Sequence, residues 1–374
     1  MTALRLVVIG LSLSSSWGNG HATTYRALLK AVAARGHTVT FLERDMPWYG
    51  GKHRDLARPD FCDLILYRDR ADLDRHAGLI RTADAVIVGS YVPDGVEVGA
   101  WVQDTAQGVV AFYDIDTPVT LGKLEAKEED YLSAGLIPRY DVYLSFSGGP
   151  ILRRLEDQFG SPAARPLYCS IDEAVHRPMD AACRWDLSYL GTYSDDRQPG
   201  LERLLIEPAR RAPHLRFVVA GPLYPDDIDW PDNVERLAHV PPNEHRSFYA
   251  QSRYTLNVTR ADMVRAGFSP SVRLFEAAAC GTPIISDPWP GLDTIFDPGR
   301  EIVLADTADI VLDTLLDHDE GRRTAIGAAG RARVLCDHTS ARRAQSLEDE
   351  LLAAMARRGA TRARHALEGR VDAL

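Results

Sequence analysis

The residues best suited to chemistry cluster in the run SPSVRLFEAAACGTPIISD, which begins at Ser269. Ser269 as N-cap and Pro270 as the first helical residue predict a helix start, and Gly281 predicts the end of that helix. Arg273 and Glu276 are three residues apart, so they project from one face of it. A surface ion pair would be worth little, but a helix rich in Ala and Phe that runs directly into an apolar strand indicates burial. We therefore expect a charged pair inside a site.

A second candidate group lies in the loop after the first apolar run, GLSLSSSWGNGHATTYR. A dinucleotide fingerprint requires G-x-G-x-x-G directly after the strand, and Gly18 and Gly20 come too far downstream of Gly10, which argues against NAD. Glycines at a helix N-terminus, with His21 beside them, instead favour an anion or an oxygen-rich ligand. A plain turn with a histidine at the helix start accounts for these residues equally well.

A third candidate is the pair Asp114 and Asp116, which closes a predicted strand. Alternate residues of an extended chain put both carboxylates on one side, where they could hold a metal ion bound to a nucleotide diphosphate. The same D-x-D spacing recurs elsewhere in the chain, so a solvated or turn-capping pair is the better explanation. Because ligands of α/β folds bind at the carboxyl ends of strands, we expect both residues in the cleft, without a metal.

An α/β fold must position these residues, because short apolar runs alternate with amphipathic helical stretches. Strands are predicted at 6–10, 38–43, 64–67, 85–89, 109–114 and 142–146, with helices at 23–35, 73–81 and 150–159. The pattern then restarts, with strands predicted at 187–192, 217–221, 234–240, 254–258, 283–287 and 301–305. We predict two Rossmann-like, doubly wound parallel-sheet domains.

The domain boundaries follow from one polar segment. Residues 171–184 form a short segment that is interrupted by Pro178, which predicts a hinge. The hinge separates an N-terminal domain, 1–170, from a C-terminal domain, 185–340. The last stretch, 341–374, is helix-prone and rich in Arg, and its few apolar positions predict a solvated helix.

The composition of the chain argues against several classes of function. The chain has 374 residues and a formal net charge of −10, which disfavours nucleic acid and anionic membrane surfaces as main partners. No apolar run approaches the length of a membrane span, and the apolar start after Arg5 is interpreted as a strand, not as a signal peptide. The five cysteines are widely spaced without C-x-x-C, which suits neither a disulfide framework nor a zinc site. We expect a reducing, cytoplasmic location.

Five blocks of the sequence resemble glycosyltransferases of the GT-B type and, within them, the CgeB-like (spore-maturation-protein-like) group. The blocks are SSWGNGHATTYR at 15–26, YDIDTPVTL at 113–121, SGGP at 147–150, YLGTYSDDR at 189–197 and SPSVRLFEAAACGTPIISD at 269–287. The resemblance implies a GT-B architecture, with two Rossmann-like domains facing a cleft. It also implies transfer of a sugar from a nucleotide-diphosphate sugar, a UDP-sugar, with no further cofactor and no metal.

The resemblance implies a role for single residues as well. Glu276 would accept hydrogen bonds from both ribose hydroxyls, and Arg197 and Arg273 would face the diphosphate, helped by the helix N-terminus at Ser271. The donor would be held mainly by the C-terminal domain and the acceptor mainly by the N-terminal one. The donor-binding residues expected on this basis are Gly18, Gly20, Arg197, His239, Val240, Arg260, Ser271, Arg273 and Glu276, with the backbone at His239 and Val240 reading the base.

The chain departs from the pattern E-x7-E of related retaining transferases, because Phe268 stands where the first Glu is expected. Arg260 and Asp262 could substitute, and retention or inversion of the anomeric centre stays open. An inverting enzyme would need a base near the acceptor. The expected catalytic group is then His21, oriented by Asp114 or Asp116.

Three rival functions remain. A non-hydrolysing nucleotide-sugar epimerase would share the architecture and the donor half but needs no acceptor. A non-enzymatic sugar-binding protein would keep the cleft but normally carries a secretory signal. A single-domain transferase that uses Asp114 and Asp116 with manganese is disfavoured by the second set of strands. The acceptor, the sugar and the oligomeric state are not predicted.

Overall fold

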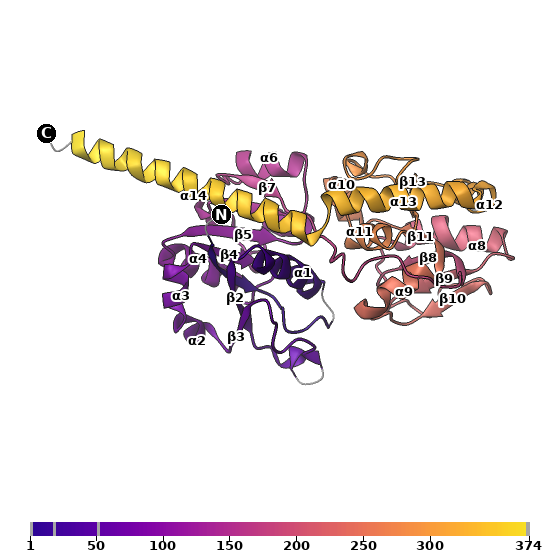
Figure 1. The fold of residues 1–374 in the computed structure, drawn as a ribbon, viewed down its shortest axis with the longest axis horizontal. Coiled ribbons are helices and arrows are strands. Elements are labelled where there is room, and N and C mark those ends of the chain that lie inside the picture. The colour runs from indigo at the N-terminus through magenta and orange to yellow at the C-terminus, as the bar shows by residue number, and fades with distance from the viewer. Residues whose placement is uncertain (1–2, 18–19, 51–52, 372–374) are drawn as a thin grey trace. The chain divides into compact units, whose positions relative to one another are not determined.

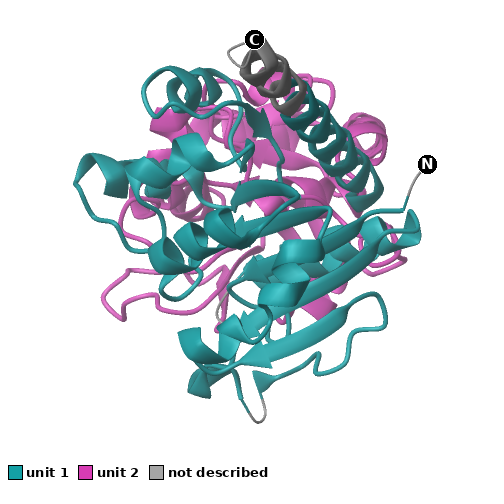
Figure 2. Ribbon diagram, turned by 90° about the vertical axis from the view of Figure 1, so that its left-hand side faces the viewer, with its two compact units in different colours: residues 1–169, 340–374 teal, residues 170–339 magenta. Residues whose placement is uncertain are grey.

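The computed structural model describes residues 3–17, 20–50 and 53–371, with side chains described as far as residue 360. The chain divides into two compact units (Figure 2). Unit 1 comprises Met1–Cys169 and Ser340–Leu374, and unit 2 comprises Ser170–Thr339. The chain therefore passes from unit 1 to unit 2 after Cys169 and returns after Thr339.

Unit 1 contains a parallel sheet of seven strands in the order β3-β2-β1-β4-β5-β6-β7. Its strands are β1 (Arg5–Gly10), β2 (Thr38–Arg44), β3 (Asp63–Tyr67), β4 (Ala85–Gly89), β5 (Val109–Asp114), β6 (Val142–Ser145) and β7 (Ala164–Pro166). The six strands predicted for the first half are confirmed. All of β4 and β5 is buried, as in parallel strands covered on both faces. The winding direction of the sheet changes between β1 and β4.

Helices surround this sheet (Figure 1). They are α1 (His21–Ala34), α2 (Arg70–Asp74), α3 (Ala77–Thr82), α4 (Gly95–Thr105), α5 (Thr117–Glu125), α6 (Pro150–Asp157) and α14 (Ser340–Val371), with η1 (Pro47–Tyr49) and η3 (Ala134–Arg139) as 3-10 turns. The single helix predicted at 73–81 is wrong, because α2 ends at Asp74 and α3 begins at Ala77.

The helix α14 belongs to unit 1, and the prediction of a solvated helix is wrong for its first half. Ala344, Leu347, Leu351 and Ala354 are at most 1% exposed and join the core of unit 1. They recur at three- and four-residue spacing, so a few apolar residues suffice to form one buried stripe. The helix packs on α1 and against β5 (Figure 1, yellow).

Unit 2 contains a parallel sheet of six strands in the order β10-β9-β8-β11-β12-β13. Its strands are β8 (Trp185–Leu190), β9 (Phe217–Ala220), β10 (Val234–Leu237), β11 (Ser252–Asn257), β12 (Ile284–Ser286) and β13 (Val303–Leu304). Each strand predicted for the second half is present. This is the doubly wound Rossmann order, and its winding direction changes between β8 and β11.

The helical segments of unit 2 cover this sheet. They are α7 (Gln198–Leu201), the π-helical turn η4 (Glu202–Ile206), α8 (Glu207–Arg211), η5 (Pro242–Glu244), α9 (His245–Ala250), α10 (Ala261–Ala266), α11 (Val272–Ala279), η6 (Leu292–Thr294), α12 (Ala308–Asp317) and α13 (Glu320–Asp337). The helices α12 and α13 begin at side-chain N-caps, since Thr307 and Asp319 accept hydrogen bonds from backbone N–H groups three residues on.

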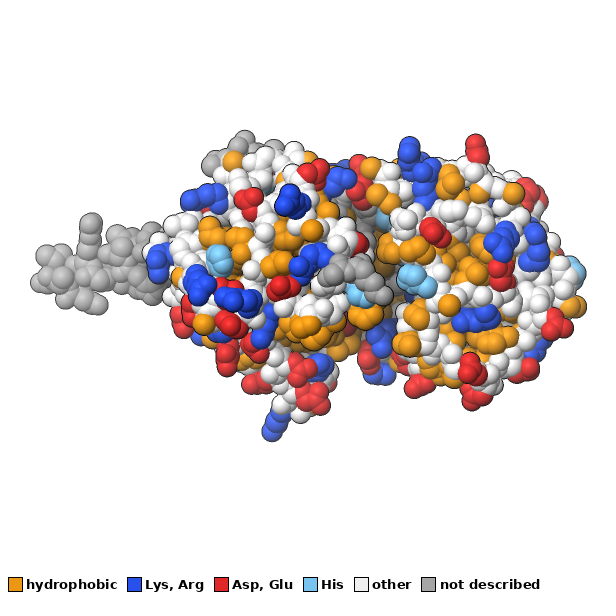
Figure 3. Space-filling view, turned by 90° about the horizontal axis from the view of Figure 1, so that it is seen from below, with side chains coloured by type: hydrophobic (Ala, Val, Ile, Leu, Met, Phe, Trp, Pro, Cys, Tyr) orange, Lys and Arg blue, Asp and Glu red, His pale blue; other side chains and the backbone are white. Residues whose placement is uncertain are grey.

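All five cysteines lie in the described part of the chain, and none of them forms a disulfide bond. Among the described residues, no helix combines the length and the apolar character that crossing a bilayer requires. Figure 3 shows hydrophobic, positive and negative side chains mixed over the face that it draws.

Candidate functional site

The carboxyl ends of β8 and β11 form the position where a doubly wound sheet binds its ligand. Gly191 follows β8, and a Cβ there would lie 2.7 Å from a terminal nitrogen of Arg273 and 2.8 Å from the Tyr189 hydroxyl. Gly221 follows β9 at φ +146°, and a Cβ there would overlap the carbonyl oxygen of Gly191. Gly221 requires glycine because its Cβ would meet backbone, and at Gly191 a Cβ would displace the Arg273 and Tyr189 side chains.

Arg197 and Arg273 lie at this switch point without a carboxylate partner. Arg197 donates from Nη2 to the Thr192 carbonyl at 2.6 Å, and Arg273 from Nη1 to the Val258 carbonyl at 3.4 Å. In each guanidinium the Nε is buried and, within the described chain, has no hydrogen-bond partner. Neither arginine forms an ion pair with a described Asp or Glu. Each guanidinium therefore keeps an Nε–H donor that no described residue uses, while Arg273 also interacts electrostatically with Glu276 and Asp287.

The lowered pKa of Arg197 also indicates that its surroundings are positively charged. Burial lowers the pKa of Arg197, and the positive charges of Arg273 and Arg260 lower it further. Arg260 precedes α10 and is exposed, with its Nε 3.9 Å from Asp196 Oδ2. The structure thus brings together three arginines that were predicted to bind the donor. Arg260 is paired with Asp196, whereas Arg197 and Arg273 lie close together without a carboxylate at ion-pair distance among the described residues, an arrangement that suits an anion.

The helix α11 begins two residues later than predicted. Ser269 is not its N-cap, because its hydroxyl donates to the Gly267 carbonyl at 2.9 Å. Ser271 holds the N-cap position in an extended conformation, with no side-chain cap hydrogen bond. Gly281, at φ +80°, ends the helix as predicted. The first N–H groups of α11 are therefore not capped by the Ser271 side chain and lie next to Arg273.

Glu276 lies on α11, is 4% exposed and contacts two histidines. Its Oε2 is 3.2 Å from Nδ1 of His245, and its Oε1 is 3.6 Å from Nε2 of His176. Burial alone would raise the pKa of Glu276, but the His245 hydrogen bond and the charges of His245, His176 and Arg273 bring it below its usual value. Glu276 is therefore held as a carboxylate. Sequence reasoning missed both histidines, because neither belongs to a recognisable motif.

Val240 and His239, the two residues expected to contact the base, differ in burial. Val240 is buried, and its backbone hydrogen-bonds the His245 imidazole; this bond helps to raise the pKa of His245 against the effect of burial. His239 beside it is exposed. Val240 thus belongs with His245 and Glu276.

Phe268, which stands where related enzymes carry a Glu, has a left-handed backbone at φ +49°. Its N–H donates to the Pro290 carbonyl at 2.6 Å, and its ring packs where a Cβ on Gly291 would lie. Asp262, a possible substitute, pairs with Arg265. The structure therefore offers no buried carboxylate at this position.

In unit 1, the loop between β1 and α1 is closed by an internal carboxylate. Glu43 is fully buried, and its Oε2 accepts hydrogen bonds from the N–H groups of Leu13 at 2.6 Å and Ser14 at 2.8 Å. Its Oε1 accepts from the Ser14 hydroxyl at 2.6 Å. Glu43 therefore occupies backbone donors that a phosphate could use in an open loop. No sequence motif indicated this residue.

The glycines predicted at this loop are placed only in part. Gly18 lies outside the described residues. Gly20 holds the N-cap position of α1 in a right-handed helical conformation, at φ −84°. His21 opens α1, and its Nδ1 is buried and has no hydrogen-bond partner in the part of the chain that the structure describes. Burial lowers the pKa of His21 to about 4, so the imidazole is neutral at pH 7.

The structure places Tyr91 between His21 and the carboxylate expected to orient it. The Tyr91 ring meets the His21 ring edge-on at 5.3 Å between centroids, and its hydroxyl donates to Asp116 Oδ2 at 3.0 Å. The direct hydrogen bond expected between His21 Nδ1 and an aspartate is not formed. Tyr91, at φ +62°, was not singled out by the sequence.

Asp114 and Asp116 make separate contacts. Asp114 is fully buried; its Oδ2 accepts from the Tyr143 hydroxyl at 2.5 Å and its Oδ1 from the Thr120 hydroxyl at 2.8 Å. Burial raises the pKa of Asp114 to about 6. Asp114 is thus a hydrogen-bonded core carboxyl, and the two carboxylates do not face one ligand together. Within the described residues, no three His, Cys, Asp or Glu side chains are grouped to hold a metal ion.

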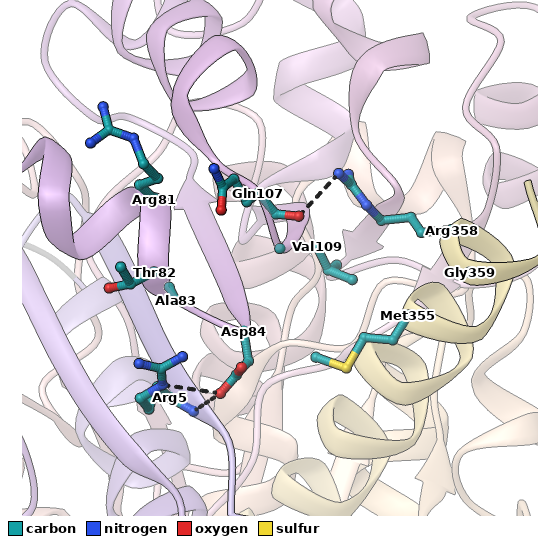
Figure 4. A pocket seen from close by; sticks show the side chains of 11 residues that line it. Arg5, Arg81, Thr82, Ala83, Asp84, Gln107, Val109, Met355, Arg358 and Gly359 are labelled. Atoms are coloured by element: carbon teal, nitrogen blue, oxygen red, sulfur yellow. Dashed lines mark hydrogen bonds and ion pairs between the residues drawn. The ribbon is translucent and has the colours of Figure 1, made fainter. Parts of the chain in front are cut away.

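A pocket of about 550 Å³ lies at the opposite ends of the unit 1 strands (Figure 4). Arg5, Asp84 and Val109 line it from the amino ends of β1, β4 and β5, and Met355 and Arg358 from α14. Arg5 pairs with Asp84, and Arg358 donates to the Gln107 carbonyl (Figure 4). Because ligands of such sheets bind at the carboxyl ends, this pocket is not the expected substrate site.

Comparison with known proteins agrees with this architecture. Residues 197–349 match a family model described as glycosyl transferase-like. No curated protein matches the chain's sequence. Sucrose-phosphate synthase from Thermosynechococcus elongatus superposes with a TM-score of 0.65 at 16% identity, over 94% of this chain and 100% of that one.

Two further solved structures share the fold. Anabaena HepE in complex with UDP-glucose has a TM-score of 0.68 at 12% identity, over 94% of this chain and 100% of its own. An alpha-glucosyltransferase in complex with UDP has a TM-score of 0.69 at 12% identity, with the same coverage. The chain has the GT-B fold, built from two Rossmann-like units, and the family match supports a glycosyltransferase.

Proposed function

We propose that the protein is a glycosyltransferase that moves a sugar from a UDP-sugar to an acceptor, and that unit 2 holds the donor. The observation that carries this proposal is the pair of half-buried arginines, Arg197 and Arg273, whose buried Nε atoms lie at the switch point of unit 2 without a hydrogen-bond partner among the described residues. A diphosphate brings two or more negative charges and several acceptor oxygens. It would supply the partners that both Nε atoms lack.

In the described part of the loop after β1, two backbone donors are already occupied, which supports assigning the donor to unit 2. In unit 1 the backbone donors of Leu13 and Ser14 are already used by Glu43. In unit 2 the corresponding loop begins with Gly191, close to Arg273. A phosphate would therefore find the unpaired Nε donors of Arg197 and Arg273 in unit 2, whereas the Leu13 and Ser14 donors of unit 1 are occupied.

The other donor contacts follow from α11 and the end of β10. Glu276 would accept from the ribose hydroxyls, and the Val240 backbone would meet the base. UDP is the proposed nucleotide because HepE and the alpha-glucosyltransferase, which share this fold, were solved with UDP or UDP-glucose. The neutralising charge would come from guanidinium groups and the α11 N-terminus, so we propose that donor binding needs no metal.

Unit 1 is the proposed acceptor side. If the enzyme inverts the anomeric centre, His21 is the proposed base, with Tyr91 linking it to Asp116. The absence of a carboxylate at Phe268 is compatible with that mechanism. The five sequence blocks also lead us to propose that the protein belongs with the CgeB-like group.

Calorimetric titration with UDP and UDP-glucose tests the donor site. Losing hydrogen bonds to a charged group costs roughly 1.5–3 kcal/mol, so Arg273→Ala should weaken UDP binding about tenfold to a hundredfold. Arg265→Ala is the matched control, because Arg265 is an exposed arginine of the same unit. Equal affinities for the two variants would contradict the proposed diphosphate site.

The chelator EDTA tests metal independence, since UDP binding should survive it. A complete loss that manganese restores would favour the Asp114 and Asp116 alternative. Turnover of UDP-sugar without any acceptor would favour an epimerase instead.

A further inference from the structure

Two histidines of unit 2 hold the Glu276 carboxylate from different elements. His245, the first residue of α9, approaches Oε2 through Nδ1 at 3.2 Å. His176, in the segment before β8, approaches Oε1 through Nε2 at 3.6 Å. Each carboxylate oxygen therefore faces its own imidazole.

Both imidazoles are themselves fixed by the backbone. The Nδ1 of His176 is 3.3 Å from the Asp172 carbonyl oxygen, and the His245 imidazole also hydrogen-bonds the Val240 backbone. Since a backbone carbonyl only accepts, each ring is oriented with one nitrogen toward the backbone. The other nitrogen is thereby directed at Glu276.

The helix α9 ties the two histidines together. Arg246, next to His245, donates from Nε to the Arg177 carbonyl and from Nη2 to the Pro178 carbonyl, both at 2.8 Å. These two bonds anchor the backbone directly after His176. One turn of α9 thus fixes both imidazoles around the same carboxylate.

A carboxylate has about four acceptor positions; His245 uses one on Oε2, and His176 approaches Oε1 at the ion-pair distance of 3.6 Å. The positions that remain suit two neighbouring hydroxyl donors, such as those of a ribose. A carboxylate free to rotate would lose entropy when it binds such a diol, and a clamped one would lose less. Arg273 on α11 and Tyr249 on α9 also interact electrostatically with Glu276.

We propose that His245 and His176 are positioning residues for ribose recognition, and that they make the donor site selective for ribonucleotides over 2′-deoxyribonucleotides. The proposal rests on the proposed function, because it assumes that Glu276 meets the ribose. A merely structural pair of histidines would affect binding of both kinds of nucleotide equally. Ribose selectivity therefore separates the two roles.

The experiment measures the dissociation constants of UDP and 2′-deoxy-UDP for wild type, His245→Ala, His176→Ala and Glu276→Ala. Wild type should prefer UDP about tenfold to a hundredfold, from the cost of a lost hydrogen bond to a charged group. In His245→Ala the preference should fall to within about threefold, and in His176→Ala it should fall part of the way. His214→Ala, at an exposed histidine of unit 2, should keep the wild-type preference.

Conservative variants guard against loss of folding. His245→Gln and His176→Gln keep an N–H donor, and they should restore part of the preference. Adding His245→Ala to Glu276→Ala should cause no further loss of selectivity, because both changes act through one carboxylate.

The outcomes separate this proposal from the function on which it rests. Wild-type selectivity in both histidine variants would overturn the positioning role and leave the ribose contact of Glu276 intact. Unchanged selectivity in Glu276→Ala would instead overturn the ribose contact itself. Equal weakening of UDP and 2′-deoxy-UDP in the histidine variants would assign the histidines to structure alone.

Discussion

Replacing Glu43 by Ala should destabilise unit 1 strongly and leave the donor site of unit 2 unchanged. Glu43 is fully buried and accepts three hydrogen bonds, from Leu13 N–H, Ser14 N–H and the Ser14 hydroxyl. Alanine would leave two backbone donors and one hydroxyl unpaired in the interior. Each hydrogen bond to a charged group is worth roughly 1.5–3 kcal/mol, and water entering the space would recover part of the loss.

We therefore expect Glu43→Ala to lower the free energy of unfolding of unit 1 by about 3–5 kcal/mol. For a unit of this size, that corresponds to a fall in Tm of about 6–20 °C. Glu43→Gln should cost less than half as much, because its amide oxygen can accept from both N–H groups while its NH₂ group donates to the Ser14 hydroxyl.

Urea and thermal unfolding, followed by tyrosine and tryptophan fluorescence, measure these differences. Glu129→Ala is the control, since Glu129 is an exposed glutamate of unit 1. UDP affinity should stay within about twofold of wild type in all three variants, because the proposed donor residues belong to unit 2. A loss below about 1 kcal/mol in Glu43→Ala would refute the claim that this carboxylate closes the loop.

Three further predictions concern unit 1. His21→Ala should reduce turnover by a factor of about 10² to 10⁴ without weakening UDP binding, and near-normal turnover in a steady-state assay would leave His21 only its place at the start of α1. Burial raises the pKa of Asp114 to about 6, so its contribution to stability is present below its unfolded pKa near 3.8 and is lost as the pH rises through 6. Asp114→Asn should remove this pH dependence of the free energy of unfolding. The same pH dependence in wild type and variant would contradict the raised pKa of Asp114. Leu347→Ala, in the buried stripe of α14, should cost about 2–5 kcal/mol in urea unfolding of unit 1, whereas a change below 0.5 kcal/mol would mean that the helix does not pack there.

The strands of both units could be predicted from the sequence because their signal is local. A parallel strand covered on both faces is a short apolar run, such as AVIVG in β4, and each run is visible without knowledge of its neighbours. Gly281 likewise marked the end of α11, since a positive φ favours glycine. The restart of the strand pattern after residue 184 indicated a second sheet for the same reason.

Helix starts were predicted less well. Ser269 and Pro270 form a good N-terminal signature, yet α11 begins at Val272 because Ser269 bonds back to Gly267. Local signatures compete with one another, and tertiary packing chooses among them.

The contacts that make the site were decided by tertiary structure. His176 and His245 reach Glu276 from separate elements, and Glu43 closes a loop that lies about thirty residues earlier in the chain. Arg35 and Glu348 bond across 313 residues when α14 docks on α1. Such pairs leave no periodicity or spacing in the sequence, because the partners become neighbours only when the sheets bring their elements together. The sequence by itself therefore determined the strands and pointed to several of the charged residues of the proposed donor site, while the partner of each charge was set by packing.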